Sequence, residues 1–265
     1  MLSSAASISF VLLPILLFRI EVYPKAALGE SETIKKANQK PTMTQQQVIE
    51  KTIQFVKTQL QNAEGGHDWF HIERVWKNAK LIAQGEDCTT AVVELGALLH
   101  DIADSKFHDG DETVGPQVAR EFLESLELPE DIIAHVENII KYISYKGGQQ
   151  SKEFTSKELD IVQDADRLDA IGAIGIARTF NYGGFKNRSI YDPSIAPDLR
   201  MTKEEYKKST APTINHFYEK LLLLKDLMNT ETGKRVAQQR HDYMLGFLDQ
   251  FYAEWNGVRN DYFYF

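Results

Sequence analysis

From Thr44 to the end of the chain, hydrophobic residues recur every three or four positions, which is the spacing of one face of an α-helix. No stretch of useful length alternates between hydrophobic and polar residues, as a half-buried strand does. The pattern therefore predicts a compact all-α bundle over residues 43–265. The expected helices cover about 44–60, 68–85, 89–101, 114–126, 129–143, 159–182, 214–228 and 236–255.

Several residues mark where these helices begin. Thr44 and Gln47 have the spacing of a capping box, and Asp68 is a suitable N-cap for the second helix. Pro129 is a good first residue for the fifth helix, because its missing N–H would have no partner there anyway. Residues 184–212 contain prolines and no clear period, so we expect a long irregular loop that is functional or mobile.

Residues 1–42 are predicted to be a separate N-terminal extension, disordered or apolar. The apolar run at 8–20 is short for a membrane span. It resembles the core of a signal peptide, but no Lys or Arg precedes it. One interpretation is a membrane anchor or export signal. The other is a disposable or non-native extension, with a natural start at Met43. The second favours a cytoplasmic protein.

Composition narrows the chemistry. The chain has 265 residues, 43% of them hydrophobic and 26% charged, as is usual for a soluble globular protein. Its formal charge of −8 argues against a nucleic-acid polymer as partner, since phosphate backbones need a basic surface. A small phosphorylated substrate held by a few local cations is still compatible. With the single Cys88 there is no intramolecular disulfide and no thiolate metal site, so any metal must use histidine and carboxylate.

Three short segments supply such groups, at 67–75, 98–106 and 164–169. His71 should face inward near a helix start. His100 and Asp101 stand where an apolar helix turns polar, and at a helix end two adjacent side chains can reach one ion. Asp166 lies on a helix that is otherwise apolar on that side. These observations make His71, His100, Asp101 and Asp166 candidates for one metal site with imidazole and carboxylate ligands.

Each of these residues also has a simpler interpretation. His100 beside Asp101 is what the helix dipole favours at a C-terminus, and His71 fits a core histidine. A buried Asp166 needs a partner, and either Arg74 or Arg167 could replace a metal. The neighbouring Asp164 and Asp169 are expected to be solvated or capping residues.

Taken together, the motifs resemble those of the HD-domain metal-dependent phosphohydrolases. Their local sequence is most similar to that of a bacterial subgroup that includes nucleoside triphosphate pyrophosphohydrolases. The resemblance runs from about Met43 to the C-terminus. The stretches that carry it are His67-Asp68-x-x-His71-Ile72-x-Arg74-Val75, Leu99-His100-Asp101-Ile102-x-Asp104-x-Lys106, Asp164-Ala165-Asp166-Arg167-Leu168-Asp169-Ala170-Ile171-Gly172-Ala173, Tyr182-Gly183-Gly184 and Tyr191-Asp192-Pro193.

The resemblance implies an HD-domain helical bundle and a divalent metal bound by His71, His100, Asp101 and Asp166. Mn²⁺ is the expected ion; Mg²⁺, Co²⁺, Ni²⁺, Fe²⁺ and Zn²⁺ stay open. Some HD enzymes bind a second metal through extra histidines. Only His108 and His135 lie in the right interval here, and neither has a partner histidine nearby in sequence, so one metal is expected.

Further roles follow from the spacing of residues after the His100-Asp101 pair and from the family resemblance. Asp104 is expected to orient or deprotonate the attacking water, with His67 and Asp68 as further candidates for that step or for contacting substrate. Cations must face a phosphoryl group that carries spread negative charge. The candidate substrate contacts are Arg74, Lys106, Lys146 and Arg167, together with Asn187 and Arg188 in the aromatic-rich region that follows.

The function expected from the sequence is hydrolysis of a small nucleotide, with a nucleoside triphosphate cut to monophosphate and pyrophosphate. A nucleotidase or phosphodiesterase acting at the same site is the alternative among enzymes. A non-catalytic helical sensor that binds a nucleotide is the alternative from another class. Membrane contact through residues 8–20 and a homodimer are both left open.

Overall fold

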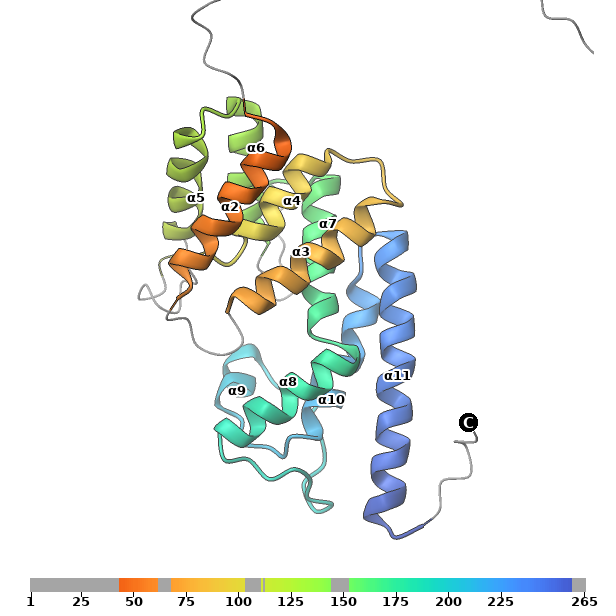
Figure 1. Ribbon diagram of the computed structural model, residues 1–265. Coiled ribbons are helices and arrows are strands. Elements are labelled where there is room, and N and C mark those ends of the chain that lie inside the picture. The colour runs from red at the N-terminus through yellow and green to blue at the C-terminus, as the bar shows by residue number, and fades with distance from the viewer. Residues whose placement is uncertain (1–42, 62–67, 103–110, 112, 144–152, 259–265) are drawn as a thin grey trace, which may run out of the picture. The chain divides into compact units, whose positions relative to one another are not determined.

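The computed structural model describes residues 43–61, 68–102, 111, 113–143 and 153–258, and within these ranges all regular structure is helical (Figure 1). The prediction of an all-α fold is thereby confirmed. The elements are α2 (Gln45–Gln59), α3 (Trp69–Ala83), α4 (Thr90–Leu99), α5 (Val114–Ser125), α6 (Glu130–Tyr142), α7 (Lys157–Asp169), α8 (Gly172–Phe185), α9 (Lys203–Lys208), α10 (Asn215–Glu219), the 3-10 helix η2 (Leu221–Leu227) and α11 (Glu231–Trp255).

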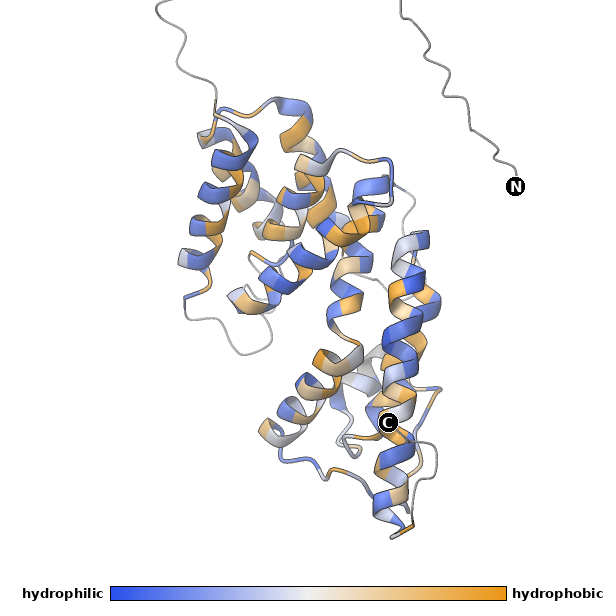
Figure 2. Ribbon diagram, turned by 45° about the vertical axis from the view of Figure 1, so that its right-hand side comes forward, coloured by the Kyte–Doolittle hydropathy of each residue, from blue (hydrophilic) through white to orange (hydrophobic). Residues whose placement is uncertain are grey.

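Helix α4 lies at the centre of the bundle and packs against α2, α3, α6 and α7. Most of its residues from Val92 to Leu99 are buried, which is expected for a helix that is hydrophobic all round. Gly96 allows α6 to approach closely, because a Cβ there would lie 3.2 Å from Ile139. The surrounding helices are amphipathic, and Figure 2 shows hydrophobic and hydrophilic residues on different faces of them.

The N-terminal caps follow the sequence pattern closely. Thr44 Oγ1 accepts a hydrogen bond from the Gln47 N–H at 3.3 Å, and Gln47 Oε1 accepts one from the Thr44 N–H at 2.9 Å, so the capping box is confirmed. Asp68 caps α3 as predicted. Pro129 is the N-cap of α6 and not its first residue, so the helix begins at Glu130, one residue later than predicted.

The prediction of one continuous helix over 159–182 was wrong. Helix α7 ends at Asp169, and α8 begins at Gly172 after the extended residue Ile171. Gly172 has a φ of +75°, which favours glycine strongly. The hydrophobic period continues across this break, so periodicity alone could not reveal it. The break turns α8 away from the axis of α7, as Figure 1 shows.

We predict that Gly172→Ala destabilises the protein. The left-handed conformation costs a non-glycine residue roughly 1–2 kcal/mol, and the new Cβ would lie 3.0 Å from Arg240 Cβ and Cγ. Chemical denaturation would measure the loss. Gly184→Ala is the matched control, since a Cβ there meets nothing within 4 Å; it should leave stability unchanged or raise it by up to about 1 kcal/mol. Equal stabilities for the two variants would contradict the prediction.

Two further differences lie between 184 and 228. The predicted helix over 214–228 is two pieces, α10 and η2, separated at Lys220, whose φ is −143° and ψ is −59°. The expected irregular loop contains the short helix α9, which was missed. Its signal was present in the sequence: Thr202 and Glu205 form a capping box.

Helix α11 runs along α7, α8 and η2. Its start is joined to α7, because Asp164 accepts hydrogen bonds from the Asn229 N–H, the Thr230 N–H and the Thr230 hydroxyl. Further along, Arg240 donates to Asn78 Oδ1 at 2.9 Å and to the Leu168 carbonyl. The two Arg240 contacts join the end of α7, which carries candidate site residues, to α3 and α11.

The N-terminal extension predicted over 1–42, with its apolar run at 8–20, lies outside the described residues. None of the helices that the structure describes is both long enough and apolar enough to span a membrane.

Candidate metal centre

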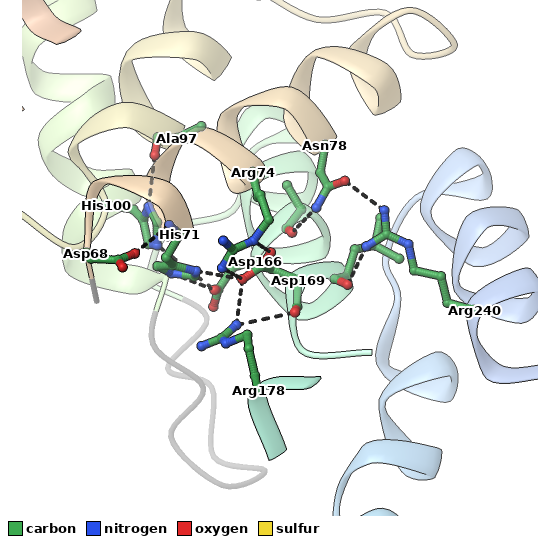
Figure 3. Close-up of polar contacts among 12 residues, drawn as sticks. Asp68, His71, Arg74, Asn78, Ala97, His100, Asp166, Asp169, Arg178 and Arg240 are labelled. Atoms are coloured by element: carbon green, nitrogen blue, oxygen red, sulfur yellow. Dashed lines mark hydrogen bonds and ion pairs between the residues drawn. The ribbon is translucent and has the colours of Figure 1, made fainter. Parts of the chain in front are cut away.

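Side chains from α3, the end of α4 and α7 converge at one place (Figure 3). His71 lies in the first turn of α3, His100 caps the C-terminus of α4, and Asp101 follows it in a turn closed by the Ile102 N–H to the Leu99 carbonyl. One potential ligand atom from each of His71, His100 and Asp101 lies within 4.8 Å of the others. The chain therefore bends after α4, as the sequence predicted, and adjacent residues face one point.

Asp166 completes this group. Its Oδ1 lies 3.6 Å from His71 Nε2 and 4.0 Å from His100 Nε2. Two ligand atoms that are each about 2.1 Å from one ion lie about 3 to 4.2 Å apart, depending on the angle between them. These separations fit a divalent cation placed between the side chains. The chemistry of the set, two imidazoles and two carboxylates, fits such an ion as well.

The imidazoles of His71 and His100 both present Nε2 toward Asp166. His100 Nδ1 lies 2.9 Å from the Ala97 carbonyl oxygen, and His71 Nδ1 lies 2.8 Å from Asp169 Oδ2. A carbonyl and an ionised carboxylate can only accept, so the proton is on Nδ1 in both rings. Each Nε2 then keeps its lone pair for a metal. This second hydrogen bond is the usual support of a metal-binding histidine.

Asp166 is not the buried carboxylate that the sequence suggested. Its side chain is 44% exposed, whereas those of Asp164 and Asp169 are 0% and 1% exposed. The expectation that Asp164 and Asp169 are solvated or capping residues was therefore wrong. Because the Asp166 carboxylate is partly exposed, it can serve as a ligand and still be reached by water and substrate.

Asp169 is the residue that sequence reasoning missed at this site. It contacts Arg74 Nε at 2.6 Å, Arg74 Nη2 at 3.0 Å and Arg178 Nη1 at 2.5 Å, in addition to His71. Burial by itself raises the pKa of the Asp169 carboxyl, but hydrogen bonds from His71 and Arg74 and the charge of Arg178 outweigh it and hold the pKa well below its usual range. One signal was available: Asp166 and Asp169 are three apart and so share a helix face.

Two of the predicted contact residues lie next to this group. Arg74 does not pair with Asp166, as one interpretation had it, but binds both oxygens of Asp169 and stays 32% exposed. That hydrogen bond raises the pKa of Arg74. Asp68 Oδ1 accepts the His71 N–H at 2.9 Å, so this carboxylate caps α3 beside the cluster. A catalytic role for Asp68 stays a prediction.

Of three other predicted contacts, two have partners elsewhere and the third lies in an exposed turn. Arg167 donates to Asp164 at 3.3 Å and to the Leu227 carbonyl at 2.7 Å, which ties α7 to η2 and gives it a structural role. Arg188 donates to the Ser209 carbonyl and lies over the Tyr182 ring. Asn187 is exposed and adopts a φ of +52° in the turn after α8. For these three a substrate contact stays a prediction.

Some predicted residues fall outside the described ranges. They are His67, Asp104, Lys106, His108 and Lys146. His135, the other candidate for a second metal, is on α6 and places its Nε2 2.9 Å from Ser156 Oγ and 3.5 Å from Glu158 Oε2. It thus has partners of its own on α7, and a single metal remains the expectation.

The bundle brings together two histidines and two aspartates from α3, the turn after α4, and α7, and this set of side chains suits the divalent-metal centre of a hydrolase. Comparison with known proteins identifies the family. The HD domain model matches residues 69–171, which contain all four candidate ligands. An HD-superfamily hydrolase from Bacillus thuringiensis is 46% identical, with 80% of this chain and 99% of that chain covered and a TM-score of 0.66.

Relatives from Bacillus subtilis agree. The uncharacterized protein YpgQ is 36% identical over 207 residues, which are 77% of this chain and 92% of YpgQ. The crystal structure of YpgQ in complex with ADP has a TM-score of 0.63 at 32% identity and covers 80% of this chain and 97% of that one. The chain belongs to the HD-domain family and is a metal-dependent phosphohydrolase of the HD superfamily.

Proposed function

We propose that this protein hydrolyses a nucleoside triphosphate to a nucleoside monophosphate and pyrophosphate, using one divalent ion, preferably Mn²⁺. His71, His100, Asp101 and Asp166 would hold the ion. The observation that carries the proposal is the convergence of His71 Nε2 and His100 Nε2 on Asp166 Oδ1, at 3.6 and 4.0 Å, with Asp101 beside them. A nucleotide is favoured because the relative YpgQ has been crystallised with ADP.

When bound, such an ion lowers the pKa of a bound water and polarises a phosphoryl oxygen. The residues of this chain supply the rest. Asp104 takes the proton of the attacking water, with His67 and Asp68 as the alternatives. Arg74 and Lys106 face the phosphate, whose negative charge is spread over its oxygens in the transition state. Lys146, Arg167, Asn187 and Arg188 are the further candidate contacts.

In the proposed reaction, water adds to the α-phosphorus. The bond from that phosphorus to the bridging oxygen breaks, and pyrophosphate leaves with the electron pair. The water oxygen therefore ends in the monophosphate. If water added instead to the terminal phosphorus, the products would be orthophosphate and a diphosphate.

A nucleotide panel tests the proposal. The purified protein is incubated with ribo- and deoxynucleoside triphosphates, monophosphates and cyclic nucleotides, with Mn²⁺ in ¹⁸O-labelled water, and with EDTA as the control. We expect monophosphate and pyrophosphate in equal amounts, the label in the monophosphate, and no reaction in EDTA. Orthophosphate as the only inorganic product identifies a nucleotidase, and cleavage of cyclic nucleotides alone identifies a phosphodiesterase. No product with any divalent metal rejects hydrolysis and leaves a nucleotide sensor.

A further inference from the structure

The last residue of α7, Asp169, joins three elements of the site. Its side chain is 1% exposed, yet it contacts one imidazole and two guanidinium groups. His71 and Arg74 come from α3, and Arg178 comes from α8, so the three groups reach the carboxylate from different elements (Figure 3). A buried carboxylate is stable only when its charge is compensated in this way.

The contact of Asp169 with His71 affects how His71 can bind a metal. Asp169 Oδ2 accepts from His71 Nδ1 at 2.8 Å, which fixes both the ring orientation and the proton on Nδ1. The opposite nitrogen, Nε2, is the atom that lies 3.6 Å from Asp166. Asp169 therefore acts on the metal site through His71, without itself belonging to the ligand group.

The contacts of Asp169 with Arg74 and Arg178 affect how these arginines can bind an anion. Arg74 binds Asp169 through Nε and Nη2, and Arg178 binds both its side chain and its backbone carbonyl. The arginine side chains are 32% and 34% exposed, so an anion from solvent can reach them. Guanidinium groups are well suited to phosphate oxygens, and holding them in advance reduces the entropy lost on binding.

We propose that Asp169 is a positioning residue for both parts of this site. It fixes the His71 imidazole for the divalent ion, and it holds Arg74 and Arg178 where a phosphate group of the substrate binds, with Arg178 as a direct phosphate contact. The phosphate part rests on the proposed function. The metal part does not, because it can be measured without any nucleotide.

The alternative is that Asp169 only stabilises the fold, and Asp164 provides the matched comparison. Both aspartates are on α7 and are fully buried, and both accept several hydrogen bonds. Asp164 receives its hydrogen bonds from Arg167, Asn229 and Thr230, on the side of α11 and η2. A general loss of stability should affect both variants, whereas a positioning role is specific to Asp169.

The first experiment measures Mn²⁺ affinity of the full chain by calorimetry, with no nucleotide, well below the unfolding temperature of each variant. Asp169→Asn is expected to weaken binding about 10- to 100-fold, as is usual when the partner of a metal-binding histidine is lost. Asp164→Asn should stay within about threefold of the wild type, because its contacts do not reach the ligands. Equal affinities for Asp169→Asn and the wild type would overturn the metal part.

A second measurement needs no variant and so does not depend on Asp169→Asn folding. In the metal-free wild type, ¹⁵N NMR of His71 should show the tautomer with the proton on Nδ1, because Asp169 Oδ2 can only accept. A neutral ring with its proton on Nε2 and none on Nδ1 would contradict the assigned role.

The third experiment tests the anion part with pyrophosphate as the probe, added to the Mn²⁺-loaded protein. Arg178→Gln is expected to weaken pyrophosphate binding about tenfold, which corresponds to one charge-assisted hydrogen bond, while Mn²⁺ affinity changes little. Arg120→Gln is the control, since Arg120 pairs with Glu124, Glu130 and Glu137 on α5 and α6. Unchanged pyrophosphate affinity in Arg178→Gln would overturn this part.

The outcomes separate this proposal from the proposed function. A protein that cleaves no nucleotide, but whose Mn²⁺ affinity falls in Asp169→Asn, disproves the proposed reaction and keeps the positioning role of Asp169. If the protein cleaves nucleoside triphosphates, but Asp169→Asn leaves Mn²⁺ affinity unchanged and Arg178→Gln leaves pyrophosphate affinity unchanged, the proposed reaction stands and the positioning role of Asp169 is rejected.

Discussion

Replacing His100 with alanine is expected to abolish tight divalent-metal binding and to lower kcat/KM for the proposed reaction by at least about 10³-fold. A metal that activates water and polarises the phosphoryl group contributes several kcal/mol to the transition state, and each 1.4 kcal/mol is a factor of ten in rate. The His100 side chain is 5% exposed and presents Nε2 to Asp166, while Nδ1 is used on the Ala97 carbonyl. No other group is placed to replace it among the residues that the structure describes at this point.

Metal content of the purified variant and steady-state kinetics with Mn²⁺ would check the prediction, and far-UV circular dichroism would confirm that the helices are intact. His135→Ala is the control, because it removes a partly buried imidazole that contacts Ser156 and Glu158 instead. It should bind one metal per chain and keep kcat/KM within about threefold of the wild type, as expected for a residue outside the site. Comparable losses in the two variants would mean that the ligand assignment is wrong.

Replacing Asp164 with alanine is expected to lower the free energy of unfolding by about 3–5 kcal/mol, the range for removing one partner of a buried ion pair. The carboxylate is fully buried, and it accepts from the backbone N–H groups of Asn229 and Thr230 and from the Thr230 hydroxyl. Without it these donors lose their partner, and Arg167, whose side chain is 10% exposed, loses its carboxylate and keeps the Leu227 carbonyl. The start of α11 would then lose these hydrogen bonds to α7 and keep the one from Asn229 Nδ2 to Gln163 Oε1.

Urea denaturation followed by circular dichroism would measure this loss. Asp226→Ala is the control: its side chain is 69% exposed and pairs only with the adjacent Lys225 in the described structure, so the change should stay within about 0.5 kcal/mol. A loss below about 1 kcal/mol for Asp164→Ala would show that water or a rearranged backbone satisfies the Asn229 and Thr230 donors, contrary to the prediction.

Much of the fold followed from local pattern. The helices from α2 to α7 begin close to the residues expected, because their starts are marked by capping side chains such as Thr44 and Asp68. The errors lie where the hydrophobic period runs on through a change of direction, as at Ile171 and Gly172, or through a change from α to 3-10 geometry, as at Lys220. Periodicity records which face is buried. It does not record where the axis turns.

The candidate ligands were also predictable, because each stands at a helix end or on a helix face that its neighbours define. His71 follows an N-cap, and His100 stands where the apolar run of α4 stops. The support of these ligands was not predictable. Asp169 was expected to be a solvated or capping residue. Arg178 was not considered, because its approach to Asp169 depends on the turn between α7 and α8.

The sequence by itself thus determined the helical class, most helix positions, the family resemblance and the candidate ligands, since these depend on spacing within one helix or on short motifs. Tertiary structure alone decided which carboxylates of α7 are buried. Asp164, Asp166 and Asp169 differ little in local pattern. Asp164 accepts hydrogen bonds at the start of α11, Asp166 lies beside the candidate ligands His71 and His100, and Asp169 contacts His71 and two arginines. Burial and partners depend on what α3, α8 and α11 bring to each face of α7, and that is set by packing between elements distant in the chain.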